Sequence, residues 1–181
     1  MKKLILFSLI LMATQMGNEQ KYMTQNGIIT FYSKTPIEDI EAVNNQVSSV
    51  FDGDNGGIAA SLLMKAFTFE KALMQEHFNE KYVESDKYPK STFKGSIENF
   101  EKLKLSSTAT QITVKGQLTI HDVTKDIIAS GTISKVDGNT LKAQFTFNIQ
   151  LSDYQVKIPS TVKDNISETI KISTNFTYKK V

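Results

Sequence analysis

Two histidines are the side chains of this sequence best suited to proton or metal chemistry near neutral pH. His77 lies close to Glu76 and Glu80, and His121 is followed directly by Asp122. Neither histidine belongs to an H-x-x-x-H or H-x-H pair, and the chain has no cysteine that could supply a thiolate ligand. We therefore predict no metal site, and we expect His121 to bond the backbone of its own turn.

The chain lacks the motifs of the common catalytic sites. There is no G-x-S-x-G turn for a serine nucleophile, no G-x-G-x-x-G or other phosphate loop, and no cysteine nucleophile. Glu76 and Glu80 are one helical turn apart, which is the expected spacing of solvated acids on an exposed face. We therefore predict no catalytic residue and no enzyme, and a catalytic use of His77 is the weakest of the alternatives.

The basic residues are all lysines: there are 21 of them and no arginine, against 19 acidic residues. Without Lys2 and Lys3, which begin the N-terminal segment described next, 19 lysines face 19 acidic residues. A net charge near zero exerts no general attraction on nucleic acid, and without arginine there are no bidentate contacts to phosphate or guanine. We predict no nucleic-acid partner.

The N-terminal residues have the pattern of a secretory signal peptide. Lys2 and Lys3 form a basic start, residues 4–12 form an apolar run too short to span a bilayer stably, and Ala13 is a small residue near a cleavage point. We predict a signal peptide over residues 1–15, without a defined cut, and hence a periplasmic or secreted protein. The remaining residues 22–181 are enough for one domain with a sizeable core.

Alternation of apolar and polar residues dominates the rest of the chain. It predicts half-buried strands over residues 112–120, 127–136, 141–151 and 170–178, with Asp137-Gly138 as a hairpin turn. Further strands are expected at residues 28–33, 46–52, 58–69 and 91–100. Short connections make the order mainly antiparallel, and about eight strands of this length favour a closed barrel over a sandwich.

Three segments have the spacing of helices. Residues 70–82 predict one short amphipathic helix, which Pro89 prevents from continuing. The sequence also allows a second short helix after Pro159, across residues 160–166. Residues 37–50 are ambiguous, because their apolar residues have helical spacing while the asparagines and serines between them disfavour a helix.

Aromatic and branched residues supply a large apolar interior. Any barrel of this size needs such filling, so composition supports a ligand cavity and a plainly packed core equally.

Three blocks of the sequence resemble the YceI-like family. Residues 116–125, Gly-Gln-Leu-Thr-Ile-His-Asp-Val-Thr-Lys, are similar to the family's G-x-L-T-I-H-G-V-T-K stretch, with Asp122 in place of glycine. Residues 67–95 resemble a second block, and the pattern G-x-x-T-F-x-S at residues 27–33, followed by Pro36, resembles the opening strand. The blocks stand in the expected order, and a single YceI-like domain over residues 22–181 is expected.

The resemblance implies an all-β fold, an eight-stranded antiparallel lipocalin-like β-barrel in which residues 39–52 are mostly strand. It also implies non-covalent binding of a long isoprenoid lipid, a polyprenyl chain or an isoprenoid quinone, in an apolar tunnel and with no other cofactor. The ligand-binding residues expected on this basis are Phe69, Phe93, Ile120, Phe145, Phe147 and Phe176 in the wall and His77, Phe78 and Tyr82 at the mouth.

Two alternatives and one departure accompany this expectation. The barrel could be packed and serve as an interaction or stress-response envelope protein without a lipid, and an edge strand left by incomplete closure could pair with a second copy as a homodimer. Many relatives carry Arg-Asp where this chain has Met74 and Gln75. The missing arginine weakens the case for a pyrophosphate head and favours a neutral one, such as a quinone.

Overall fold

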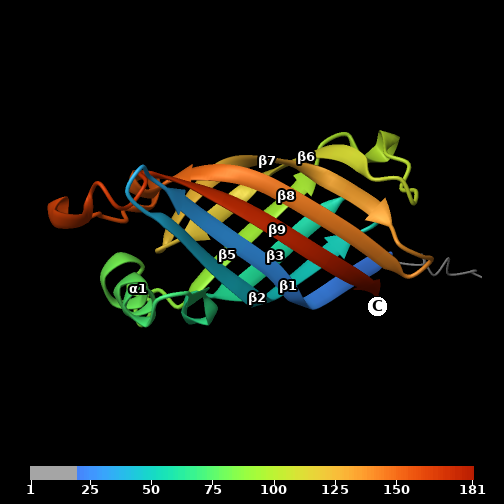
Figure 1. Ribbon diagram of the computed structural model, residues 1–181. Helices are drawn as coiled ribbons and strands as arrows, with labels where there is room; N and C mark the ends of the chain where they lie inside the picture. The colour runs from blue at the N-terminus through green and yellow to red at the C-terminus, as the bar shows by residue number, and fades with distance from the viewer. Residues whose placement is uncertain (1–19) are drawn as a thin grey trace, which may run out of the picture.

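The computed structural model describes residues 20–181, and the predicted signal peptide over residues 1–15 lies outside them. In this part of the chain nine strands form one sheet (Figure 1). Their bounds are β1 Lys21–Lys34, β2 Asp39–Asp52, β3 Gly57–Leu63, β4 Thr68–Phe69, β5 Lys90–Ile97, β6 Thr110–Ile120, β7 Val123–Lys135, β8 Thr140–Gln150 and β9 Thr169–Lys180.

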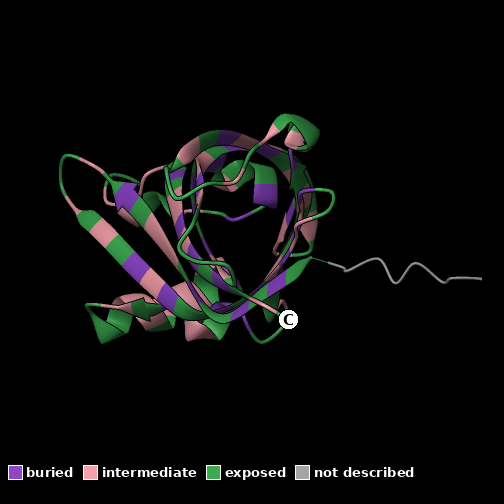
Figure 2. Cartoon of the chain, turned by 90° about the vertical axis from the view of Figure 1, so that its right-hand side faces the viewer, coloured by how far each residue is buried: buried purple, intermediate pink, exposed green. Residues whose placement is uncertain are grey.

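The strands close into a barrel. Neighbouring strands are antiparallel in the order β1-β9-β8-β7-β6-β5-β3-β2, and β2 pairs back with β1 over most of its length. The two-residue β4 pairs with β2 at Ala42 and Val43 and stands outside the ring of eight. Seen along its axis, the ring is continuous (Figure 2). The predicted eight-stranded antiparallel barrel is confirmed, while the homodimer, argued from an open edge, stays a prediction.

The connections gather at the two ends of the barrel. Helix α1 (Ala72–His77), the π-helical turn η2 (Phe78–Tyr82) and the loop 151–168 lie at one end, which we call the helical end (Figure 1). The loop 98–109, with the 3₁₀ turn η3 (Phe100–Lys102), the turn 136–139 and the C-terminus lie at the other, the closed end. Among the described residues no helix has both the length and the apolar character needed to cross a bilayer.

The predicted helix over residues 70–82 is confirmed as α1 followed by η2. The loop between β8 and β9 contains two 3₁₀ turns, η4 (Leu151–Tyr154) and η5 (Ser160–Val162). After Pro159 the backbone bonds run from Lys163 to Ser160 and from Asn165 to Val162. These bonds span three residues, so the second helix is reduced to a 3₁₀ turn.

Two predicted strands end earlier than expected. The strand over residues 58–69 stops at Leu63 and continues as the 3₁₀ turn η1 (Met64–Ala66) and β4. The N–H of Met64 donates to the carbonyl of Pro89, but a proline has no N–H to return the bond, and the ladder ends there. The strand over residues 91–100 stops at Ile97, shortly before Asn99, whose φ of 53° is left-handed.

The ambiguous segment is strand, as the resemblance implied, and it contains a β-bulge. The register of β2 against β1 shifts between Asn44 and Val47, and both residues face the interior with 0% exposure. The Asn44 amide is satisfied at the bulge, because its Nδ2 donates to the Leu63 carbonyl at 3.0 Å and its Oδ1 accepts from the Gln46 N–H at 2.9 Å. The bulge thus puts a three-residue step between two inward-facing residues of β2.

Aromatic side chains fill the closed end. Tyr22, Phe51, Phe176 and Tyr178 are each at most 3% exposed. Successive rings of this group lie 5.7–6.1 Å apart between centroids. Gly27 makes room for Phe176, since a Cβ at Gly27 would lie 2.5 Å from the Phe176 Cδ1. The interior of this half of the barrel is therefore packed.

Candidate ligand cavity

A cavity of about 340 Å³ lies at the helical end of the barrel. Its lining is mostly apolar, and ligand pockets in proteins span roughly 300–1,000 Å³. The strands contribute inward-facing residues, among them Ile29, Phe31, Ile40, Leu62, Leu118, Phe147, Ile149, Ile170 and Ile172. An apolar ligand would gain about 25 cal/mol for each Å² of surface it buries here.

Four phenylalanines fasten the helical segment to the barrel. Phe78 of η2 stacks on Phe31 of β1, with ring centroids 5.5 Å apart and 29° between the ring planes. Phe67 and Phe69, which precede the helix, contact these two rings at 5.1–5.7 Å. The contacts hold one side of α1 and η2 against the cavity, where Met74, His77 and Phe78 contribute to its lining.

Six of the nine predicted ligand-binding residues line this cavity: Phe69, His77, Phe78, Tyr82, Ile120 and Phe147. The chain brings them from β4, the helical segment, β6 and β8 to the same end of the barrel. The three residues expected at the mouth all belong to α1 and η2, at the helical end. That these side chains contact a ligand stays a prediction.

Phe93, Phe145 and Phe176 face the interior but are not part of this lining. Phe145 and Phe176 are 6% and 3% exposed, and their rings lie 6.4 Å apart in the packed half. The Phe93 ring lies over Gly95, where a Cβ would come within 2.6 Å of its Cζ, and packs against both hydrophobic clusters of the core. Strand alternation predicted the side on which these rings lie, but not their height along the barrel.

The loop between β8 and β9 supplies lining that the sequence analysis missed. Tyr154, Val156, Ile158, Val162 and Ile166 line the cavity although they lie outside the strands. Apolar residues that recur in a loop are the signal that could have found them, because loops usually run over the solvated surface. The polar lining residues Glu38 and Asn165 carried no such signal.

Glu38 forms a polar link across the helical end. Its Oε1 accepts a hydrogen bond from Lys71 Nζ at 2.9 Å, and its Oε2 accepts one from Asn165 Nδ2 at 3.3 Å. The bond from Lys71, and then that from Asn165, lowers the pKa of Glu38, and the same contact raises the pKa of Lys71. The link joins the β1–β2 loop, the start of α1 and the loop before β9.

Two tyrosines bring hydroxyl groups to the lining. Burial raises the pKa of Tyr82, and burial with the nearby Asp153 raises the pKa of Tyr154 to about 12. Both hydroxyls therefore keep their protons near neutral pH. Within residues 20–181 no hydrogen bond joins the ring of His77 to either tyrosine.

His121 lies outside the lining and ties segments of the helical end together. Its side chain is 10% exposed, and its Nδ1 lies 3.2 Å from the Tyr154 carbonyl and its Nε2 2.8 Å from the Glu84 Oε2. The expected bond to its own turn is wrong, because these partners are 33 and 37 residues away in sequence. Among residues 20–181 no three His, Asp or Glu side chains form a group that could hold a metal ion.

The comparison with known families decides how this barrel is classified. Residues 22–178 match the model of the YceI-like domain. The chain belongs to the YceI-like family. The resemblance carried by three sequence blocks is thereby confirmed over nearly all the described residues. The comparison with curated proteins found no match to this YceI-like chain.

Solved structures have the same fold as this YceI-like domain. A polyisoprenoid binding domain from Saccharophagus degradans, implicated in plant cell wall breakdown, has a TM-score of 0.76 at 12% identity, covering 90% of this chain and 99% of that chain. BcnA from Burkholderia cenocepacia has a TM-score of 0.69 at 16% identity, covering 83% and 95%. The YceI protein of Campylobacter jejuni has a TM-score of 0.55 at 19% identity, covering 77% and 84%.

The family stretch at residues 116–125 forms the β6–β7 hairpin of this YceI-like domain. Ile120 pairs with Val123, so only His121 and Asp122 make the turn, with φ of 53° and 60°. Two successive positive φ values are the signature of a type I′ turn, which favours glycine or asparagine. Asp122 thus occupies a left-handed position where the family pattern has glycine.

Proposed function

We propose that this YceI-like domain binds a long isoprenoid lipid non-covalently and performs no reaction on it. The ligand is a polyprenyl chain or an isoprenoid quinone, with its apolar chain inside the cavity. The observation that carries the proposal is the apolar cavity of about 340 Å³ at one end of an otherwise packed barrel. The Saccharophagus degradans domain of the same fold is a polyisoprenoid binding domain, which supports the same class of ligand here.

Burial of the isoprenoid chain would supply most of the affinity. Each CH₂-sized group removed from water contributes about 0.8 kcal/mol, so a few isoprene units outweigh much of the cost of association without strong polar contacts. The isoleucines, leucines and phenylalanines of the lining offer such contacts along the length of a chain. A lining of this kind suits a carrier better than a catalyst.

The proposal includes a periplasmic or extracellular location. The basic start and apolar run of residues 1–15 support export of the chain. In an aqueous compartment an isoprenoid chain needs a protein interior that shields it from water, which a closed barrel with an apolar cavity provides.

The first test is the identity of any lipid that accompanies the protein. The full chain would be expressed in a bacterial host with an isoprenoid-containing membrane, purified without detergent and extracted with organic solvent for mass spectrometry. We expect an isoprenoid near one molecule per chain. An empty protein that also takes up neither ubiquinone nor a polyprenol in titrations would overturn the proposal.

A matched pair of variants locates the binding site. Ile120→Trp puts a large ring into the lining, whereas Ile128→Trp changes a residue of β7 that is 62% exposed. We expect Ile120→Trp to weaken polyprenol binding by about tenfold or more, through the loss of roughly two buried CH₂ groups, and Ile128→Trp to leave it unchanged. Equal affinities of the two folded variants would place the lipid elsewhere.

A packed barrel that acts as an interaction or stress-response envelope protein without a lipid is the second candidate. The solid closed end and a cavity near the lower limit of known ligand pockets favour it. It predicts no co-purifying isoprenoid and no saturable uptake of polyprenol or quinone by the wild-type protein.

A further inference from the structure

The cavity wall contains no lysine or arginine in the described part of the chain. Its ionisable residues are Glu38, His77 and the two tyrosines Tyr82 and Tyr154, and no lysine lines it. The chain has no arginine at all. An anionic head group such as a phosphate would therefore lose its hydration without meeting a lysine or an arginine in the wall, which is costly in an apolar site.

A lysine that contacts the wall is already engaged. Lys71 donates to the Glu38 carboxylate at 2.9 Å, and its side chain is 62% exposed whereas that of Glu38 is 23% exposed. The hydrogen bonds from Lys71 and Asn165 favour the ionised form of Glu38. A phosphate that recruited Lys71 would lie beside this carboxylate, so two negative charges would share one lysine.

Polar groups without a hydrogen-bond partner among the described residues remain at the same end. The His77 ring and the Tyr82 hydroxyl belong to the lining and make no hydrogen bond to another residue within residues 20–181. A hydroxyl or carbonyl oxygen on a lipid can bond such groups without bringing a charge. The helical end therefore has free hydrogen-bond partners for an uncharged oxygen, whereas the Glu38 carboxylate would repel an anion.

We propose that Glu38 makes the cavity selective for isoprenoid lipids with an uncharged oxygen-containing head group and against the same lipids carrying a phosphate. This inference rests on the proposed function, because it concerns the ligand of the same cavity. It assigns Glu38 a role in specificity through charge, in addition to its link to Lys71 and Asn165.

The test compares two ligands with identical isoprenoid chains, geranylgeraniol and geranylgeranyl monophosphate. We expect the wild-type protein to bind the alcohol about tenfold or more tightly than the monophosphate, because like charges in contact disfavour binding. Glu38→Gln keeps an acceptor for Lys71 and removes the negative charge. It should raise the affinity for the monophosphate about tenfold relative to that for the alcohol.

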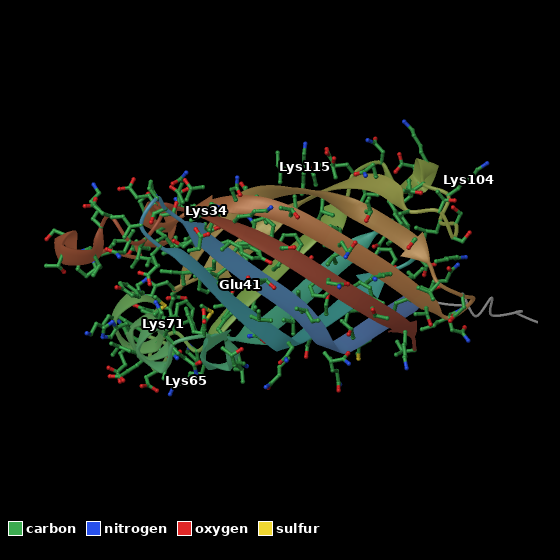
Figure 3. The ribbon with its side chains drawn as sticks, viewed as in Figure 1. Lys34, Glu41, Lys65, Lys71, Lys104 and Lys115 are labelled. Atoms are coloured by element: carbon green, nitrogen blue, oxygen red, sulfur yellow. The ribbon has the colours of Figure 1, made fainter. Side chains whose placement is uncertain are left out.

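Glu41→Gln is the matched control. Glu41 lies three residues after Glu38 and is exposed on β2 (Figure 3). It carries the same charge as Glu38 without lining the cavity, and its substitution should leave both affinities unchanged. If both variants raised monophosphate binding equally, the effect would reflect net charge and the role of Glu38 would be refuted.

The outcomes separate this inference from the proposed function. Wild-type protein that binds neither ligand contradicts lipid binding itself. Wild-type protein that binds both with equal affinity refutes selectivity by Glu38 and leaves lipid binding intact. Melting curves of both variants show whether they fold. If Glu38→Gln does not fold, the ratio of the wild-type affinities for the alcohol and the monophosphate still tests the selectivity.

Discussion

The hydroxyl of Tyr178 lies 2.8 Å from the Oγ of Ser49, and this hydrogen bond ties β9 to β2 across the inner face of β1. Ser49 donates its own proton to the Ala59 carbonyl at 2.9 Å, so Tyr178 is the donor of the pair. At the helical end Tyr154 is also almost fully buried, yet its hydroxyl has no partner within residues 20–181. The closed end is satisfied in its polar groups and the cavity end is not.

Phenylalanine substitutions should separate the two tyrosines. Tyr178→Phe removes a buried hydrogen bond and should lower the free energy of unfolding by about 1 kcal/mol. Tyr154→Phe removes a hydroxyl that is desolvated without compensation, and should leave the stability unchanged or raise it by up to about 1 kcal/mol. Urea unfolding followed by circular dichroism measures both, and equal destabilisation would show that Tyr154 has a partner in solution.

Gly27 should tolerate no side chain. A Cβ there would lie 2.5 Å from the Phe176 ring and 3.2 Å from the Val47 carbonyl, so Gly27→Ala should destabilise the protein by about 1–3 kcal/mol through overpacking. Gly138→Ala is the control, because nothing lies within 4 Å of the Cβ it would add. The melting temperature should fall for Gly27→Ala alone, and a neutral result there would mean that the Phe176 ring moves freely.

Replacing Asp122 by glycine, the residue of the family pattern, should stabilise the protein. Its φ of 60° strains a residue with a Cβ, so Asp122→Gly should stabilise the protein by about 0.5–1 kcal/mol. Asp126→Gly, at an exposed position of β7, should instead cost about 0.5–1 kcal/mol, because glycine is disfavoured within a strand. Chemical denaturation of the two variants compares them, and opposite signs are the expected result.

The link between Glu38 and Lys71 should make stability depend on pH. The pKa of Glu38 is lowered from 4.5 in the folded state, so its contribution is present above pH 4.5 and is lost as the pH falls through the folded value. The pKa of Lys71 is raised from 10.5, so its contribution is present below that pH and is lost as the pH rises through the folded value.

This pH dependence can be isolated with Glu38→Gln. The variant should melt below the wild type at neutral pH, and the difference should shrink as the pH falls well under 4.5, where Glu38 becomes protonated. Glu41→Gln serves as the control and should show no such convergence. If the difference in melting temperature between wild type and Glu38→Gln were the same at every pH, a structural role for the link would be contradicted. Because both side chains are solvated, added salt should reduce the effect.

Local pattern was sufficient for much of this fold. Side chains in a strand alternate between two faces, so the sequence around Phe145 and Phe147 identifies a strand and places both rings inside the barrel. The same rule fails at Asn44 and Val47, because a bulge adds a residue to the repeat and only pairing with β1 reveals it.

The residues of a chain thus define which faces are apolar, where strands turn and, through the YceI-like blocks, which family fold results. They do not define which inward-facing rings pack and which leave a cavity. Phe147 lines the cavity while Phe145, two residues earlier, lies in the packed half, because height along the barrel depends on strand register and on neighbouring side chains. Glu38 meets Lys71 across 33 residues and Asn165 across 127, and such contacts exist only once the barrel has closed.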